Sequence, residues 1–390
     1  MAGRRRASNR RRRKRKLIVF IIEIIILALV LGVLFLYSKL EKIDYEELDT
    51  TQVEVNELTD ETVETLSGYT TIALFALDNR DTGTYTNGNS DVIMVMAINN
   101  DTKEVSLVSI YRDTYLDVSA SGESWKFRKA NAAYAYGGAE QAISMLNRNL
   151  DLDIDNYVTV DFAAVAEAID ILGGVEIEIE SSAELGYLND YIVATNKILG
   201  TSSSTISTVG THTLDGVQAV AYCRIRYTSG NDYKRAERQR RVIAAMVEQA
   251  KQASLSQISE LVNTVFPDIQ TDLTKAEILS MVSVLLGYDL SSSGGFPYDK
   301  TTYTPSSSIG DVVVACDLES NVIELHEQLY GTEDYEPSET VLQYSSYIIN
   351  STGITADSAV DDESSDEDDF TGDGTEEEDD TADESEDDAS

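Results

Sequence analysis

Residues 69–113, YTTIALFALDNRDTGTYTNGNSDVIMVMAINNDTKEVSLVSIYRD, contain three runs of β-branched and apolar residues separated by turn-forming residues. The runs 72–77, 91–98 and 105–110 predict three strands. The NNDTKE segment between the second and third runs is typical of a hairpin turn. We therefore expect an antiparallel meander, in which the first and third strands end at the edge where the second begins.

Charged residues gather at that edge of the predicted meander. Asp78 follows the first strand, and Asp91 opens the second. Arg112 and Asp113 follow the third strand. Two carboxylates beside an arginine favour a site for a hard divalent cation, such as Mg²⁺, and a phosphate. The plainer alternative is that the two aspartates only bracket a loop.

A second concentration of positive charge lies in AYCRIRYTSGNDYKRAERQRRVI, residues 221–243, which holds seven Lys or Arg and two acids in a chain of net charge −39. We expect a strand over residues 217–227, on which Arg224 and Arg226 face the same way. Unpaired charges in an apolar strand would be costly, so they need an anion. Pyrophosphate suits them, because Arg binds phosphate oxygens in a bidentate manner.

The long helix predicted after this strand, with ERQRRVIAAMVEQAKQ at residues 237–252, extends the cluster. Helical spacing places Arg235, Arg238 and Gln239 on one face. Asp232 lies at the helix start, where it can cap the helix or take part in chemistry. A solvated basic face accounts for the remaining arginines.

Composition excludes several classes of function. A body that is acidic outside this cluster argues against a general nucleic-acid binder. Two histidines in 390 residues supply a Ser–His–Asp mechanism poorly. Cys223 and Cys316 form no CxxC pair. They can pair as one disulfide or stay as separate buried thiols, and the second interpretation is favoured.

The N-terminal part predicts a membrane anchor. Residues 1–16 hold ten Lys or Arg and no acid, and residues 17–37 are almost uninterruptedly apolar. A helix of that length spans a bilayer core, and the basic flank places its N-terminal end in the cytoplasm. We expect a single-pass protein of the cell membrane, with an acidic stalk over residues 38–67 and everything beyond it extracellular.

The remaining chain predicts one α/β domain at residues 68–332, built from layers of sheet and helices. Within it, residues 156–180, NYVTVDFAAVAEAIDILGGVEIEIE, predict a strand, a helix and a second strand. A C-terminal extension follows at 333–390. Its residues 361–390 hold eighteen acids and no base, which predicts a disordered tail.

Seven ordered motifs resemble the LytR–CpsA–Psr family of cell-wall glycopolymer ligases. They cover residues 70 to 245 and are ALDNRD, NSDVIM, VSIYRDTY, KANAAYAYGG, DILGGVEIEI, LDGVQAVAYCRIR and DYKRAERQRRVI. The resemblance implies a three-layer α-β-α domain with a mixed central sheet, preceded by a single transmembrane helix. Tyr111 departs from the family, where Pro is common before the arginine.

The family's activity is the transfer of a glycopolymer, such as teichoic acid or capsular polysaccharide, from a polyprenyl-pyrophosphate carrier to peptidoglycan. The resemblance implies a Mg²⁺ site at Asp78 and Asp91. For the mechanism we expect Asp91, Arg112 and Asp232 to act in catalysis, where Asp91 or Asp232 takes the acceptor proton or no base is needed. The residues that the resemblance implies for the pyrophosphate are Arg112, Arg224, Arg226, Arg235 and Gln239, with Arg80, Asp113, Asp232 and Arg238 as further polar members.

Two other functions remain open from the sequence. A hydrolase of similar pyrophosphate substrates would use water in place of the sugar acceptor. A surface receptor or regulator would bind an anionic polymer without any reaction. Direct binding of nucleic acid is not expected, because the basic cluster at 221–243 is predicted to lie outside the cell.

Overall fold

The structure is a computed structural model that describes residues 44–49, 51–77, 85, 88–226, 231–274, 277–278, 289–332 and 334–359. The predicted membrane span at 17–37 and the acidic tail at 361–390 lie outside these residues. None of the helices in the described ranges is long and apolar enough to cross a membrane.

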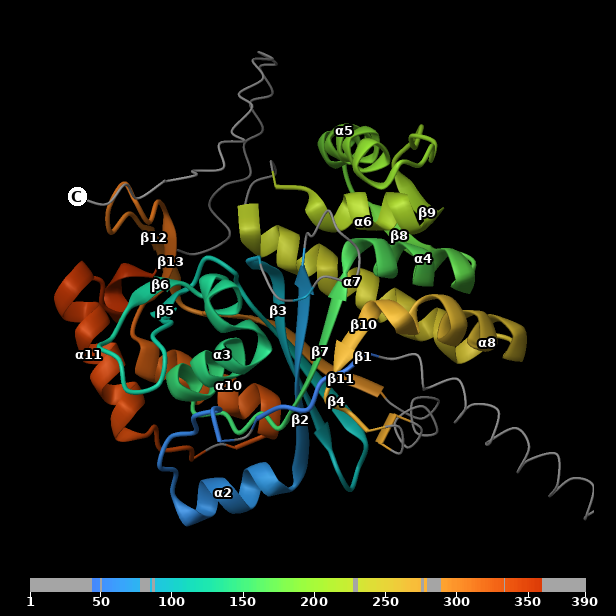
Figure 1. Ribbon diagram of the computed structural model, residues 1–390. Helices are drawn as coiled ribbons and strands as arrows, with labels where there is room; N and C mark the ends of the chain where they lie inside the picture. Colours follow the sequence, from blue (N-terminus) through green and yellow to red (C-terminus); the bar gives the residue numbers. More distant parts are fainter. Residues whose placement is uncertain are drawn as a thin grey trace, which may run out of the picture. The chain divides into compact units, whose positions relative to one another are not determined.

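A seven-stranded mixed sheet forms the centre of the domain (Figure 1). Its strands, in spatial order, are β1 (Asp44–Tyr45), β10 (Ile269–Thr271), β7 (Asn156–Asp161), β2 (Tyr69–Leu77), β3 (Ser90–Asn99), β4 (Glu104–Ile110) and β11 (Asp289–Phe296). Strands β2, β3 and β4 pair antiparallel in sequence, as predicted. Strand β7 runs parallel to β2, and β11 runs parallel to β4.

Helices cover both faces of this sheet, which confirms the mixed α/β class with a mixed central sheet (Figure 1). One layer consists of α3 (Ala132–Leu150), α10 (Leu318–Tyr330) and α11 (Glu339–Thr352). The other contains α4 (Phe162–Leu172), α6 (Gly216–Arg224) and α7 (Asn231–Gln252). Successive side chains of a strand point to opposite faces of the sheet, so Phe75 of β2 packs against the first layer and Ala76 against the second.

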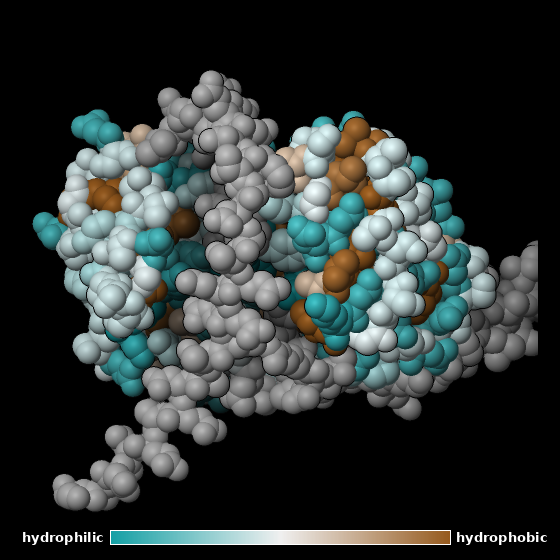
Figure 2. Space-filling model, turned by 90° about the horizontal axis from the view of Figure 1, so that it is seen from above, coloured by the Kyte–Doolittle hydropathy of each residue, from teal (hydrophilic) through white to brown (hydrophobic). Residues whose placement is uncertain are grey.

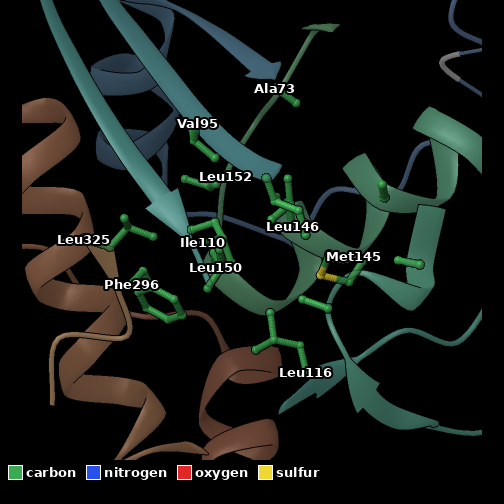
Figure 3. Packing of buried hydrophobic residues seen from close by; sticks show 14 of the residues in the cluster. Ala73, Val95, Ile110, Leu116, Met145, Leu146, Leu150, Leu152, Phe296 and Leu325 are labelled. Carbon is green, nitrogen blue, oxygen red and sulfur yellow. The ribbon is translucent and has the colours of Figure 1, made fainter. Parts of the chain in front are cut away.

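The larger hydrophobic core lies between the sheet and the first helical layer. Figure 3 shows Val95 and Ile110 of the sheet facing Leu146 and Leu150 of α3, with Leu325 of α10 beside them. Cys316 is buried in the same core, and Cys223 is buried at the end of α6; both are free thiols, as favoured from the sequence. Burial raises the pKa of Cys223 to about 12.

The predicted strand–helix–strand unit at 156–180 is present as β7, α4 and β8 (Val175–Ile179), but β8 lies outside the central sheet. Strand β8 pairs with β9 (Gly210–Leu214) in a separate two-stranded sheet beneath α5 (Ser182–Leu199) and α6. Only alternate residues of β8 are buried, which is typical of an antiparallel strand with one solvated face. On the face seen in Figure 2, brown groups lie over the part formed by α5 and β9, where Val193, Ile198 and Val209 are exposed.

The prediction of a strand at 217–227 is wrong, because residues 217–224 belong to helix α6. Asp215 caps the helix and forms a capping box with Gln218. Residues 216–223 are all buried, so the continuous apolar run that suggested a strand belongs to a helix covered on every side. A Cβ at Gly216 would lie 1.9 Å from the Ala166 carbonyl oxygen, so this glycine lets α6 approach α4.

The folded part extends beyond the predicted limits of 68 and 332. The expected stalk at 38–67 contributes β1, the buried Leu48 and Leu66, and helix α2 (Asp60–Ser67). At the other end, α11 packs on the main core. Buried Asp151 joins the two segments, because it accepts hydrogen bonds from Asn56 at 2.5 Å and from the Ser338 hydroxyl at 2.6 Å.

Further short elements lie around the central sheet. Hairpin β5 (Tyr115–Asp117)–β6 (Phe127–Lys129) follows β4, and β12 (Lys300–Tyr303) pairs with β13 (Val312–Ala315). Helix α8 (Leu255–Thr264) packs against α4. Helix α7 crosses the upper ends of the central strands (Figure 1), which brings its arginines to the edge where Asp91 lies.

Candidate anion-binding site

The centre of the candidate site is Asp91, the second residue of β3. Arg112, which follows β4, donates from Nη1 to Asp91 Oδ1 at 2.6 Å. Arg235 of α7 places Nη2 at 3.2 Å from Asp91 Oδ2. The side chain of Asp91 is 13% exposed and that of Arg235 only 3%, so the ion pairs are largely shielded from solvent. The meander therefore brings Asp91 and Arg112 together as expected, and α7 adds a second guanidinium.

The electrostatics keep Asp91 ionised. Burial by itself would raise the pKa of this carboxyl group. Arg235, Arg112 and, more weakly, Arg226 outweigh that effect, and the pKa of Asp91 falls below its ordinary value. Arg226 belongs to the same charged neighbourhood, because it lines one cavity with Arg235.

Asp113 holds Arg112 from its other side. Its Oδ2 lies 3.6 Å from Arg112 Nε, and its Oδ1 lies 3.1 Å from Lys129 Nζ. The backbone is also fixed, because Asn131 N–H donates to the Arg112 carbonyl at 3.0 Å. Asp113 therefore orients the guanidinium, which Asp91 receives on the other side.

A cavity of about 320 Å³ opens next to these ion pairs, lined by Tyr191, Arg224, Arg226 and Arg235. Arg235 also lines a small hollow of about 10 Å³ beside Asp91 and Arg112, room for about one water molecule. Arg235 thus stands between the Asp91 ion pairs and the larger cavity. The volume of the larger cavity, about 320 Å³, lies at the lower end of the range of roughly 300–1,000 Å³ that is typical of ligand pockets.

Arg224 and Arg226 reach this cavity by a route that differs from the prediction. Arg224 is the last residue of α6, and its Nη1 donates to Thr195 Oγ1 at 3.4 Å. Ile225 leaves the helix with φ −58° and ψ 123°, so the chain is extended when it reaches the exposed Arg226. Both arginines therefore reach the cavity from the C-terminal end of a helix and not from the strand that the sequence predicted.

The three positions predicted on one face of α7 separate in the structure. Gln239 lines the small hollow with Arg235 and donates from Nε2 to the Cys223 carbonyl at 3.4 Å. Arg238 points to α5, where its Nε donates to Glu184 Oε1 at 2.8 Å, and both residues are buried. Arg238 is thus paired with a carboxylate of α5, and its expected part in pyrophosphate binding stays a prediction.

Three predicted site residues cannot be placed. Asp78 and Arg80 lie outside the described residues, and for Asp232, in the first turn of α7, only the backbone is described. Within the described ranges, no group of three or more His, Cys, Asp and Glu is arranged to hold a metal ion.

Sequence reasoning missed an aromatic and cationic group next to Arg112. The ring of Tyr111 lies 4.8 Å from that of Tyr233 on α7, and Lys300 Nζ lies 4.5 Å from the Tyr233 ring. A Cβ at Gly295 of β11 would lie 2.3 Å from the Tyr111 hydroxyl. The Gly-Gly pair at the end of β11 was the available signal, since glycine in a strand often marks a close approach.

The chain is similar in sequence to a known protein family and to individual known proteins. Residues 30–293 match the LytR_cpsA_psr family. The chain is 33% identical over 205 residues to the polyisoprenyl-teichoic acid–peptidoglycan teichoic acid transferase TagU of Enterococcus faecalis, an alignment that covers 52% of this chain and 61% of TagU. It is 30% identical over 206 residues to biofilm regulatory protein A of Streptococcus mutans, covering 52% and 48% of the two chains. The alignments thus span less than two thirds of either relative.

A solved structure shares the fold. It is that of the LytR-CPS2A-psr family protein YwtF (TagT) with bound octaprenyl pyrophosphate lipid, and TagT comes from B. subtilis. The TM-score is 0.53 at 20% sequence identity, with 74% of this chain and all of that chain covered.

Proposed function

The chain belongs to the LytR_cpsA_psr family, and from this premise we propose that it is a membrane-anchored extracellular phosphotransferase. It would move a glycopolymer from a polyprenyl-pyrophosphate carrier to peptidoglycan and release polyprenyl phosphate. The observation that carries the proposal is the position of Arg235, which binds Asp91 together with Arg112 and also lines the cavity of Arg224 and Arg226.

The charge at this site suits a pyrophosphate diester. Four guanidinium groups against the carboxylates of Asp91 and Asp113 give a local excess of positive charge in a chain of net charge −39. Arginine binds phosphate oxygens in a bidentate manner, and a site with four such groups favours an anion with several oxygens. The related TagT structure, which holds octaprenyl pyrophosphate lipid, and the name of TagU support the substrate class.

Asp91 is also suited to hold a divalent cation, with Asp78 as its proposed partner. A carboxylate has about four lone-pair sites, and the contacts to Arg112 and Arg235 each use one. Its lowered pKa keeps it in the form that binds Mg²⁺. When bound, Mg²⁺ would neutralise negative charge on the phosphate oxygens.

The proposed reaction is a displacement at the phosphorus that carries the glycan. A peptidoglycan hydroxyl oxygen bonds to that phosphorus, and the bond to the bridging oxygen breaks. Polyprenyl phosphate leaves with the electron pair. The charge that develops on it lies among Arg112, Arg235, Arg224 and Arg226, which stabilise it without covalent chemistry.

The acceptor proton needs a separate group. A general base works best when its pKa is near the working pH, and the pKa of Asp91 is held low. We therefore assign Asp91 to charge stabilisation and metal binding, and Asp232 in the first turn of α7 is the candidate proton acceptor. The predicted anchor at 17–37 would keep the site near a donor that is itself embedded in the bilayer.

The proposal is tested with the full chain in detergent, Mg²⁺, a polyprenyl-pyrophosphate-linked glycan and a soluble peptidoglycan oligomer. Joined glycan and released polyprenyl phosphate are followed for the wild type, Asp91→Asn and Arg112→Ala. The matched control is Arg241→Ala on the same helix, since Arg241 is bound by Glu180 and Glu237 away from the cavity.

The expected result is joined product for the wild type and the control, with losses on the order of 10²–10³ in rate for the two site variants. Lipid phosphate without joined product would identify a hydrolase instead. Donor binding without turnover, unchanged in Asp91→Asn, would leave only a receptor and overturn the proposal.

A further inference from the structure

Aromatic side chains are exposed together on one part of the surface. Trp125 is 45% exposed, Tyr136 of α3 is 51% exposed, and Tyr347 of α11 is 38% exposed. Trp125 contacts Tyr347, Lys126 lies over Tyr136, and Arg128 follows on β6; we call these five residues the Trp125 surface. Large rings exposed near one another are typical of a binding site.

The rings are held in fixed positions. Buried Phe127 stacks on Tyr347 with centroids 4.4 Å apart, and Trp125 meets the Tyr347 ring edge-on at 5.8 Å. Trp125 also packs edge-on against buried Tyr344, whose hydroxyl donates to Asp117 at 2.9 Å. The surface is therefore arranged before any ligand arrives, which lowers the entropic cost of binding.

The Trp125 surface carries positive charge in an acidic protein. Residues 125–129, WKFRK, hold three cations and no acid. Lys126 Nζ lies 3.9 Å from the centre of the Tyr136 ring and is exposed. Arg128 is two residues further along, on the side opposite buried Phe127. Rings and cations thus alternate, which favours a ligand with both flat apolar faces and negative charge.

The surface continues into the candidate site. Its strand β6 ends at Lys129, whose Nζ contacts Asp113, the residue that orients Arg112. Two residues later, Asn131 N–H donates to the Arg112 carbonyl. Tyr347 lies on α11, beyond the part of the chain that matches the family at 30–293. The surface therefore combines a strand next to the site with a helix outside the family match.

We propose that the Trp125 surface binds the acidic glycopolymer of the donor beyond its pyrophosphate end. The C–H faces of sugar rings would pack on Trp125 and Tyr347, and phosphate or carboxylate groups would pair with Lys126 and Arg128. The inference rests on the proposed function, because that function supplies the glycan. It adds a second point of contact, which holds the polymer while its pyrophosphate end lies at Arg112 and Arg235.

A direct binding test is available because Trp125 is the only tryptophan of the chain. Its fluorescence in the full chain in detergent is titrated with a glycosylated poly(glycerol phosphate) teichoic acid, a neutral chitin oligosaccharide and soluble peptidoglycan. Teichoic acid should shift the emission and protect the ring from acrylamide quenching. The affinity should fall as salt rises from roughly 50 to 200 mM, since exposed charges are screened.

Variants assign the signal to the surface. Lys126→Ala combined with Arg128→Ala should weaken teichoic acid binding by about tenfold, because the exposed Lys126 and the half-buried Arg128 each lose a charge contact with the polymer. Tyr45→Ala, which removes an equally exposed ring on β1, should change nothing. No response to any of the three ligands would overturn the proposal, as would an equal response to the neutral glycan. A response to peptidoglycan alone would show that the surface binds the acceptor and not the donor, which would also overturn the proposal.

Turnover separates this proposal from the proposed function. Tyr347→Ala should raise the KM for a donor with a long acidic polymer by about tenfold and leave a donor with a single sugar unaffected. Asp91→Asn should lose activity on both donors while its Trp125 fluorescence still responds to teichoic acid. Equal KM values for both donors in Tyr347→Ala would overturn the surface alone, whereas full activity of Asp91→Asn would overturn the proposed function alone.

Discussion

Asp91 and Arg112 are 21 residues apart in the chain, yet their side chains meet at 2.6 Å. The pair forms because β3 begins where β4 ends, so the geometry of the antiparallel meander brings an acid and a base to one edge. Arg235 closes the group from α7. Any change that breaks this pair therefore acts on the sheet edge and on the helix above it.

Asp91→Asn should lower stability in a way that depends on pH. The pKa of Asp91 is lowered from 3.8, so its ion pairs stabilise the fold above that value and the contribution is lost as the pH falls through the lower folded pKa. Urea unfolding should show a gap between wild type and variant at neutral pH that closes in acid. Asp101→Asn, in an exposed turn, serves as control, and a gap that persists unchanged in acid would contradict the assignment.

Arg238→Ala should act on stability and not on donor binding. Arg238 and Glu184 form a buried pair at 2.8 Å, and removal of one partner leaves a buried charge, which costs about 3–5 kcal/mol. Chemical unfolding measures the loss. Replacing both residues, with Arg238→Met and Glu184→Leu, should recover most of it. A stable Arg238→Ala protein with weakened donor binding would instead return Arg238 to the pyrophosphate site.

Gly295→Ala should destabilise the protein by about 1–3 kcal/mol, because the new methyl group would overlap the ring of Tyr111. The same substitution should cost far less in a Tyr111→Ala background, as a double-mutant cycle can measure. Gly186→Ala in α5 is the matched control, since a Cβ there meets nothing within 4 Å and alanine favours a helix. Additive losses at 295 and 111 would show that the two positions do not interlock.

His326 should make stability fall between pH 6.5 and about 4. Burial lowers the pKa of this ring to about 4, against the opposing hydrogen bond to the Leu150 carbonyl. The unfolded chain binds a proton near 6.5 and the folded chain only near 4, so acid favours unfolding by up to roughly 3 kcal/mol.

Unfolding of His326→Gln across this interval gives the check. The variant keeps a side-chain N–H for Leu150 but does not titrate, so the slope of stability against pH should flatten. His212→Gln, at the half-buried second histidine on β9, is the matched control for the loss of a histidine. Equal slopes for all three proteins would assign the acid sensitivity to other groups.

The strands and the sheet edge were predictable because their signals are local. Three apolar runs with turn residues between them predict a meander, and the meander alone brings Asp91 to Arg112. By contrast, α6 is buried on all sides, so its sequence has no helical periodicity to separate it from a buried strand. Only the Asp215–Gln218 capping box marks it as a helix.

Long-range partners could not be predicted from spacing. Arg238 and Gln239 are neighbours in sequence, but a carboxylate from α5 binds one and a carbonyl at the end of α6 binds the other. The predicted limits of the folded domain, residues 68 and 332, were too narrow for a similar reason. Asp151 gathers Asn56 and Ser338 from segments with weak apolar patterns, and only the folded structure brings them together.

The order of strands in the sheet has a consequence in time. Among the described strands, β1 pairs with β10 alone. The pairing of Asp44 with Gln270 can therefore form only after residue 270 has been synthesised. At about 5–20 residues per second, synthesis of the intervening chain takes on the order of ten seconds or more. Until β10 and β11 have been made, the edges of β7 and β4 that these strands cover in the sheet are unpaired, and open edges invite aggregation. A nascent chain that stalls before β10 and β11 are made would present those edges to whatever strand it meets first.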